Sequence, residues 1–198
     1  DVVFAAVRYT QLEAVAETLR ANSSKNIVFV GNNVRAAELT ARLPEKNVLF
    51  AFSLSAGHRE NNRVVSIDLK KITIGPLSGS PSAETLIKQI FEGTHYTVIY
   101  EPHMEDYLLC HAAFVLPAAF ACYKTDGNLK KLKGNTAYLN RMIDANIEGY
   151  RAIQKAGHEI LPDADKDFES SAAYRKTCLR FFKLMCATPL GKICASDH

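Results

Sequence analysis

The sequence predicts an α/β protein in which a mostly parallel sheet with helices is followed by an all-helical C-terminal domain. Up to about residue 100, short β-rich runs alternate with amphipathic stretches, in the order strand, helix, strand, helix, strand. That order favours parallel strands joined by right-handed helical crossovers, as in doubly wound folds. After residue 100 the strand signals stop and helical periodicity takes over. We therefore place a domain boundary between residues 1–101 and 102–198.

The first of these domains shows the clearest alternation of elements. Its amphipathic stretches are 11–19 and 34–43, each about the length of a crossover helix. The β-rich runs, dominated by β-branched and aromatic residues, are 2–7, 27–30, 48–52, 64–67, 72–74 and 97–100. Between two of these runs, the polar segment 57–62 is interpreted as a solvated hairpin loop, with a place in a binding cleft as the alternative.

The second domain contains three helical stretches. Nearly every position of 104–123 is apolar or small, which predicts a helix enclosed on most sides. The stretch 136–156 has apolar residues at helical spacing, and Gly157 follows as a terminator. A third stretch covers 170–185. Thr188 and Pro189 then predict the cap and first residue of a further helix.

Composition excludes several classes of partner. The net charge of +3 is spread along the chain without a basic face, which argues against nucleic acid. By our count, no apolar run reaches the roughly 18 to 20 residues needed to cross a bilayer, and no secretory signal opens the chain, so we expect a cytoplasmic protein with no membrane partner. The five cysteines lie in apolar or helical segments without metal-site spacing, which predicts reduced, buried thiols and no metal.

The first residues form a complete buried strand, so we expect upstream strands and a truncated sheet, and we expect the C-terminal end to be truncated as well. A glycine-rich Gly-x-Gly-x-x-Gly turn, which cradles the phosphates of dinucleotides, is absent from the sequence.

Five segments, in order along the chain, resemble motifs of the ketopantoate reductase (2-dehydropantoate 2-reductase) family. Segment 6–12 is similar to the family's strand end of the form apolar, Lys, any two, Gln; segment 27–33 resembles its next strand with an Asn-Gly turn; and 72–76 resembles its "Ile-Gly" strand. Segments 114–117 and 126–129 resemble its "Asn-Pro" helix and "Asn-Gly-Glu-Leu" turn.

This resemblance implies an oxidoreductase that transfers hydride from NADPH to a 2-oxo acid between two domains. Residues 1–101 would be the C-terminal half of its Rossmann-like dinucleotide-binding domain, and 102–198 part of its helical substrate and dimerisation domain, which leaves a homodimer as an open alternative. NAD in place of NADP also stays open. Because the glycine-rich turn is missing, we expect the chain by itself to bind dinucleotide poorly and to be inactive.

The sequence departs from the family where its chemistry is concentrated. The catalytic lysine that the family carries would fall at Leu108 or Leu109. The asparagines that orient its substrate would fall near Ala112 and Leu116. The resemblance therefore does not carry over ketopantoate itself as the substrate.

Three residues are the candidates for a site. His111 is a titratable side chain near the position of the missing lysine, and it would serve as general acid facing the cleft between domains; a core histidine is the alternative. Arg8, where the family most often has Lys, would meet a ribose or phosphate oxygen, or else be a solvated strand-end residue. Asn32 follows a strand end, where open sheets bind ligands, although Asn32 or Asn33 would equally serve to cap a helix beginning near Val34.

Two functions are compatible with these observations. In one, the parent protein is an NADP-dependent oxidoreductase acting on a small 2-oxo acid or a related carbonyl. In the other, the scaffold has lost catalysis and acts as a binding or regulatory module, which the missing lysine favours.

Overall fold

Residues 1–188 are described by a computed structural model of the protein, in which the chain forms two compact units. The first unit consists of residues 1–54 and 69–109. The second consists, among the described residues, of 55–68 and 110–188. The units divide within helix α4 (Met104–Lys124), between Leu109 and Cys110, whereas we expected a boundary at 101/102 and residues 55–68 in the first domain.

The first unit contains a sheet whose strand order is β1-β2-β3-β4-β5. The strands are β1 (Val2–Ala5), β2 (Asn26–Val30), β3 (Asn47–Glu60), β4 (Arg63–Gly75) and β5 (Thr97–Tyr100). β1 pairs with β2, β2 with β3, and β4 with β5, all in parallel. The predicted mostly parallel sheet is therefore confirmed.

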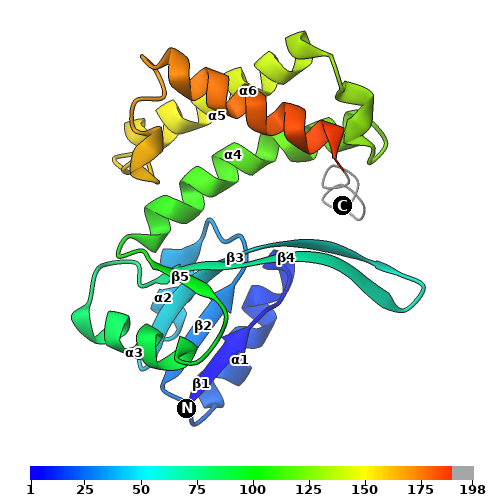
Figure 1. Cartoon of the computed structure of the whole chain (residues 1–198). Coiled ribbons are helices and arrows are strands. Elements are labelled where there is room, and N and C mark those ends of the chain that lie inside the picture. The colour runs from blue at the N-terminus through cyan, green and yellow to red at the C-terminus, as the bar shows by residue number, and fades with distance from the viewer. Residues whose placement is uncertain (189–198) are drawn as a thin grey trace. The chain divides into compact units, whose positions relative to one another are not determined.

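Helices cover both faces of this sheet (Figure 1). Two of them, α1 (Leu12–Ala21) and α2 (Ala36–Arg42), bury apolar residues such as Leu19 and Leu39 against one face. On the other face, α3 (Pro81–Phe91) buries Ile87. The sequence reading missed α3, although Pro81 at its first position is a typical start signal.

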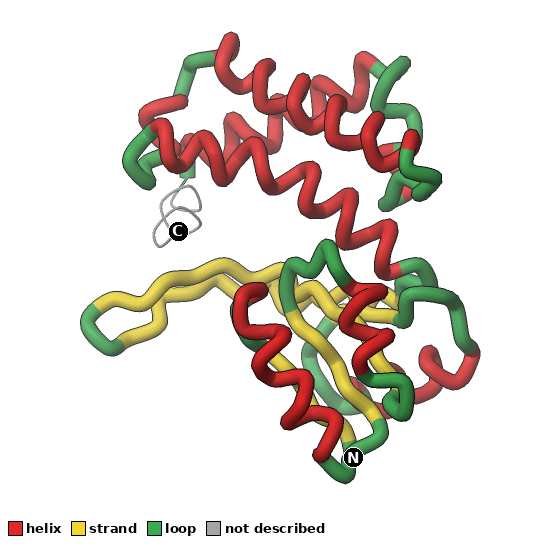
Figure 2. Tube along the Cα trace, turned by 180° about the vertical axis from the view of Figure 1, so that it is seen from behind, coloured by secondary structure: helices red, strands yellow, loops and turns green. Residues whose placement is uncertain are grey.

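β3 and β4 form a long hairpin that continues beyond their pairing with β2 and β5 (Figure 2). The turn consists of Asn61 and Asn62, whose φ angles are 45° and 62°. Positive φ at both central residues suits a two-residue hairpin turn, and Asn tolerates it better than most side chains. Two expectations are corrected here: the runs at 64–67 and 72–74 are one strand, and most of the predicted loop at 57–62 is strand.

Gly75 explains the "Ile-Gly" motif at the end of β4. A Cβ atom built there would lie 1.7 Å from the carbonyl oxygen of Glu101. No other residue type allows the backbone to approach so closely.

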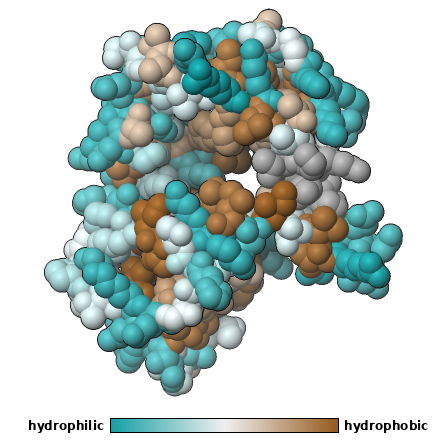
Figure 3. Space-filling model, viewed as in Figure 1, coloured by the Kyte–Doolittle hydropathy of each residue, from teal (hydrophilic) through white to brown (hydrophobic). Residues whose placement is uncertain are grey.

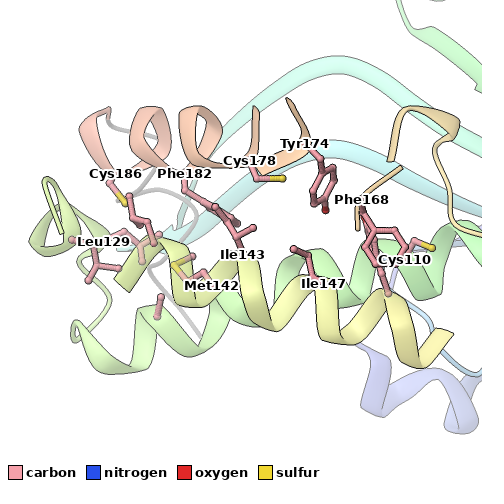
Figure 4. Packing of buried hydrophobic residues seen from close by; sticks show 14 of the residues in the cluster. Cys110, Leu129, Met142, Ile143, Ile147, Phe168, Tyr174, Cys178, Phe182 and Cys186 are labelled. Carbon is pink, nitrogen blue, oxygen red and sulfur yellow. The ribbon is translucent and has the colours of Figure 1, made fainter. Parts of the chain in front are cut away.

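The second unit is helical throughout its part of the chain from Cys110 to Thr188. Its main elements are the rest of α4, α5 (Thr136–Lys155) and α6 (Ala172–Ala187), with short 3-10 turns at Leu129–Leu132 and Asp163–Asp165. Figure 4 shows the core between them, where Ile143, Phe182 and Cys178 pack together. The four cysteines in the described residues are buried and form no disulfide, as predicted.

Thr188 corrects one helix boundary. It ends α6 as a C-terminal cap, with its N–H donating to the carbonyl oxygen of Leu184. The helix that we predicted from Pro189 lies outside the described residues.

α4 is less enclosed than predicted. Apolar side chains reach the surface in several places (Figure 3), and on α4 the exposed ones are Leu116, Phe120 and Tyr123. The helix is also long and apolar enough to cross a membrane by length and composition, contrary to our expectation. A core helix of a soluble protein passes the same test, so this finding alone does not place α4 in a bilayer.

Candidate functional site

The candidate site lies at the carboxyl ends of β1 and β2. Because these neighbouring strands are parallel, the loops that follow them emerge at the same edge of the sheet. This edge is where open α/β sheets bind ligands. It holds a pocket of about 270 Å³, lined by Tyr9, Thr10, Leu12, Glu13, Asn33, Arg35, Glu38, Leu39 and Arg42.

The loop after β1 is held by a local pair of hydrogen bonds. The backbone N–H of Arg8 donates to Oε1 of Gln11 at 3.1 Å, and the N–H of Gln11 donates to the carbonyl oxygen of Arg8 at 2.8 Å. These bonds start a 3-10 turn (Tyr9–Gln11) that leads into α1. These hydrogen bonds explain structurally why Gln11 stands at the end of the motif that resembles the reductase family. Arg8 itself is exposed and does not line the pocket.

The loop after β2 turns at Gly31, whose N–H donates to the carbonyl oxygen of Ala51 at 2.9 Å. Asn33 Oδ1 then accepts a hydrogen bond from the backbone N–H of Arg35 at 2.9 Å. α2 begins only at Ala36, with Arg35 at its N-terminal cap and no side-chain cap bond. The interpretation of an asparagine cap is therefore wrong: Asn33 forms a turn ahead of the helix, and Asn32 is exposed.

Asn33 is the unusual side chain of this pocket. It is 3% exposed, and its Nδ2 is buried without a hydrogen-bond partner among the described residues. Since Oδ1 already accepts from Arg35, the amide orientation is set, and Nδ2 is a donor. A buried donor without an acceptor costs about 1–3 kcal/mol, so such groups are rare in folded proteins and call for an explanation.

Charged side chains border the pocket in compensating pairs. Arg35 Nε donates to Glu38 Oε2 at 2.8 Å, and Arg35 Nη1 lies 3.4 Å from Glu13 Oε1. Arg42 Nη2 lies 3.3 Å from the same Glu13 oxygen. Glu38 raises the pKa of Arg35, and Arg35 lowers the pKa of Glu38. Two guanidinium groups thus face two carboxylates, and the rim carries no net charge.

His111 belongs to the second unit, on α4. Its side chain is partly buried, and this burial lowers its pKa to about 4. The imidazole is therefore neutral at pH 7. Its predicted place at a cleft between domains stays a prediction.

A second pocket, of about 500 Å³, lies between α3 and β5. Two of its charged lining residues, Glu84 and Lys88, pair with each other at 2.8 Å. Within residues 1–188, no buried side-chain atom without a partner lines it. The β1–β2 edge is thus the better candidate for a specific site.

Sequence reasoning identified this edge but not the side chains that line its pocket. Arg8 and Asn32 follow β1 and β2, as predicted, and they lie next to the lining residues Tyr9 and Asn33. The position after each strand was the available signal. Which neighbouring residue turns inward depends on the loop conformation, which the sequence pattern does not encode.

No protein-family model and no curated protein matches the sequence. Solved structures do match in fold. The dimeric ketopantoate reductase from Staphylococcus aureus has a TM-score of 0.66 at 15% identity, over 92% of this chain and 58% of that one. A 2-dehydropantoate 2-reductase from Porphyromonas gingivalis has a TM-score of 0.66 at 13% identity, over 93% of this chain and 62% of that one.

The complex of D-mandelate dehydrogenase with NADH has a TM-score of 0.71 at 10% identity, over 98% of this chain and 62% of that chain. The chain thus has the fold of these reductases, and the resemblance to ketopantoate reductases is confirmed at the level of the fold. It spans about three fifths of the length of these neighbours.

Proposed function

We propose that the chain is part of an NAD(P)H-dependent oxidoreductase, resembling 2-dehydropantoate 2-reductase, that reduces a 2-oxo acid or a related carbonyl. The observation that carries this proposal is the pocket at the carboxyl edge of β1 and β2, in a fold shared with reductases. The substrate stays at the level of a class, because leucine and alanine stand where the family's lysine and one of its asparagines would be.

In this proposal the dinucleotide lies along the carboxyl edge of the sheet. The buried donor of Asn33 and the compensated charges beside it fit a polar cofactor that contributes acceptor atoms. Arg8 would meet a phosphate or ribose oxygen, and Asn32 would contact the cofactor from the next loop. NADP is the proposed cofactor, with NAD as the alternative, and the bound nicotinamide would supply the hydride.

His111 is the proposed proton donor to the nascent alkoxide. In a complete, active enzyme, His111→Gln would lower the maximal rate of carbonyl reduction about 10²-fold, the usual scale for a general acid. A variant that keeps its rate but melts earlier would mark His111 as a core residue.

The second candidate function is a binding or regulatory module without catalysis. The lowered pKa of His111 favours it, because a neutral imidazole is a poor acid at pH 7, and so does the absence of the family lysine. A cytoplasmic location and a homodimer are part of either proposal. The dimer is supported by the Staphylococcus aureus ketopantoate reductase, which is dimeric.

Nuclear magnetic resonance (NMR) titration of the 198-residue chain with NADPH, up to millimolar concentrations, tests the site. We expect the backbone amides of residues 8–13 and 31–38 to shift progressively, with weaker or equal effects of NADH. Shifts confined to other residues, or none at all, would contradict a dinucleotide site at this edge.

A further inference from the structure

The strand β5 ends the sheet in the described part of the chain, so one of its two sides has no neighbouring strand there. Its other side pairs in parallel with β4, where the N–H of Glu101 donates to the carbonyl oxygen of Ile74 at 3.1 Å. Along a strand, the backbone groups of alternate residues point to the same side. The N–H and C=O groups of Val98 and Tyr100 therefore point away from β4.

These outward groups are available to a further strand. Within residues 1–188, no backbone hydrogen bond joins Val98 or Tyr100 to another segment on this side. A row of unpaired donors and acceptors at a sheet edge is a template for strand pairing. An extended polypeptide offers the complementary groups at the same spacing, whereas a compact apolar molecule does not.

The second pocket, of about 500 Å³, adjoins this edge between α3 and β5. Val98 and Tyr100 line it from the strand, and the buried Ile87 and the partly buried Phe91 line it from the helix. The Tyr100 ring is held in place, because its hydroxyl donates to the carbonyl oxygen of Ser80 at 3.2 Å. The same two strand residues thus provide the outward backbone groups and one wall of the pocket. A strand added to β5 would direct every second side chain over the pocket.

The rim of this pocket carries one uncompensated negative charge. Glu84 and Lys88 pair at 2.8 Å and offset each other. Glu92 also lines the pocket, is exposed, and has no ion-pair partner within residues 1–188. It stands at the C-terminal cap of α3, where the helix dipole disfavours a carboxylate and favours a cation. A basic side chain therefore complements this end of the pocket.

We propose that the β5 edge and the adjoining pocket bind an extended segment of a different polypeptide, which adds a strand to the sheet. The segment places an apolar side chain in the pocket and a basic side chain beside Glu92. Hydrogen bonds of the main chain supply affinity in this mode of recognition, and the pocket supplies selectivity. This surface is separate from the β1–β2 edge, because β3 and β4 lie between β2 and β5. It does not rest on the proposed function.

Backbone-methylated peptides test whether a strand is added. The probe is a peptide of sequence Lys-Val-Thr-Phe-Thr-Lys, capped at both ends, whose apolar side chains share one face when it is extended. Two analogues carry N-methyl groups, either on Val and Phe or on both Thr residues. Only one of these alternate sets faces β5 in an added strand. Amide NMR spectra of the labelled 198-residue chain are recorded with each peptide up to millimolar concentrations.

We expect the parent peptide to shift the amides of residues 84–92 and 97–101. One methylated analogue should bind about tenfold more weakly or not at all, because its donors to β5 are lost, and the other should bind like the parent. The proposal is overturned if the parent peptide shifts neither segment, or if both analogues bind as well as the parent.

Two variants of the chain test the edge and the rim separately. Val98→Pro removes an outward N–H, keeps an apolar side chain and is tolerated on an edge strand, so it should abolish binding of the parent peptide. Glu92→Gln should weaken binding about two- to fivefold, the scale of an exposed ion pair. Its matched control is Glu45→Gln, since Glu45 is exposed and does not line the pocket.

Equal binding by Val98→Pro and the wild type would overturn strand addition, and equal binding by Glu92→Gln and Glu45→Gln would overturn the role of the rim charge. If Val98→Pro fails to fold, the methylated peptides still decide the question on the wild type. Shifts of residues 97–101 that depend on the concentration of the chain alone would make a second copy the occupant. That result would overturn the assignment to a different polypeptide.

Discussion

Two buried asparagines, one in each compact unit, each have a side-chain amide nitrogen without a hydrogen-bond partner in the described part of the chain, but they lie in different surroundings. Asn33 in the sheet unit is 3% exposed, and Asn146 in the helical unit is 1% exposed. In both, Nδ2 is buried without a partner among the described residues, while Oδ1 accepts a hydrogen bond, from Arg35 N–H in one and from the Tyr174 hydroxyl in the other. Asn33 lines a pocket at a sheet edge, whereas Asn146 belongs to the buried interior of α5.

The comparison shows that an unpaired buried amide does not by itself indicate a site. Around Asn146, Tyr174 and Tyr150 hold a polar cluster in which the Tyr150 hydroxyl donates to Asp165 Oδ2 at 2.9 Å. Burial raises the pKa of both tyrosines and of Asp165. We interpret this cluster as structural, and the Asn33 pocket as a place for a ligand.

The largest expected effect is a loss of folding stability at acidic pH that is caused by His111 in the helical unit. Its pKa is about 4 in the folded protein and about 6.5 in the unfolded chain, so only the unfolded chain takes up a proton in this window. Stability attributable to His111 is therefore fully present above pH 6.5 and is lost as pH falls to 4, by about 3 kcal/mol. Urea denaturation of wild type and His111→Gln at pH 7 and pH 4.5 measures this. An equal loss in both proteins would show that His111 is not desolvated.

Asn146→Ala tests the structural side of the comparison. It removes the acceptor of the buried Tyr174 hydroxyl, and we expect a loss of about 2 kcal/mol in the free energy of unfolding. NADPH-induced shifts at residues 8–13 should be unchanged. A neutral effect on stability would mean that the hydroxyl finds another partner.

Tyr150→Phe should cost less, about 1 kcal/mol, because the bond to Asp165 is lost while the ring remains in the core. Chemical denaturation at pH 7 provides the measurement. A stabilised variant would contradict the interpretation of this pair as favourable.

Asn22→Asp should change stability least. Because Asn22 is exposed and the oxygen that accepts from Ser24 N–H is retained, we expect a change within about 0.5 kcal/mol. Asn33→Asp places a carboxylate at a position that is 3% exposed, so it should lower the free energy of unfolding by about 1–3 kcal/mol at pH 7. Urea denaturation of the two variants measures the difference, and equal stabilities would contradict the burial of the Asn33 side chain.

Much of the fold was predictable because its signals are local. The strand at Thr97–Tyr100 is placed as expected, and the helical stretch 136–156 matches α5, which ends before the predicted terminator Gly157. α3, between the runs at 72–74 and 97–100, was missed although Pro81 at its first position signals a helix start. The exposure of Phe120 on α4 was not predictable, because an apolar sequence does not say which of its faces finds a partner.

The site was predictable only in its position. Strand ends at Arg8 and Asn32 identified the edge of the sheet, but the inward direction of Asn33 depends on its turn with Arg35 and on Gly31, which bonds to the neighbouring strand. Neither this local turn nor the bond between Gly31 and the distant Ala51 leaves a periodic signal in the sequence.

Calorimetry measures how tightly the 198-residue chain binds NADPH. Because the chain lacks the glycine-rich phosphate turn, we expect no saturable binding of NADPH at micromolar concentrations. A clear micromolar isotherm would show that the phosphates are held by residues other than those of a glycine-rich turn.

Hydrogen–deuterium exchange of the 198-residue chain, with and without NADPH at about 10 mM, tests the central claim most directly. The account predicts slower exchange in residues 8–13 and 31–38 at the β1–β2 edge, and unchanged exchange in residues 142–150 around Asn146. Protection of 142–150 with none at the sheet edge would contradict a dinucleotide site between the loops that follow β1 and β2.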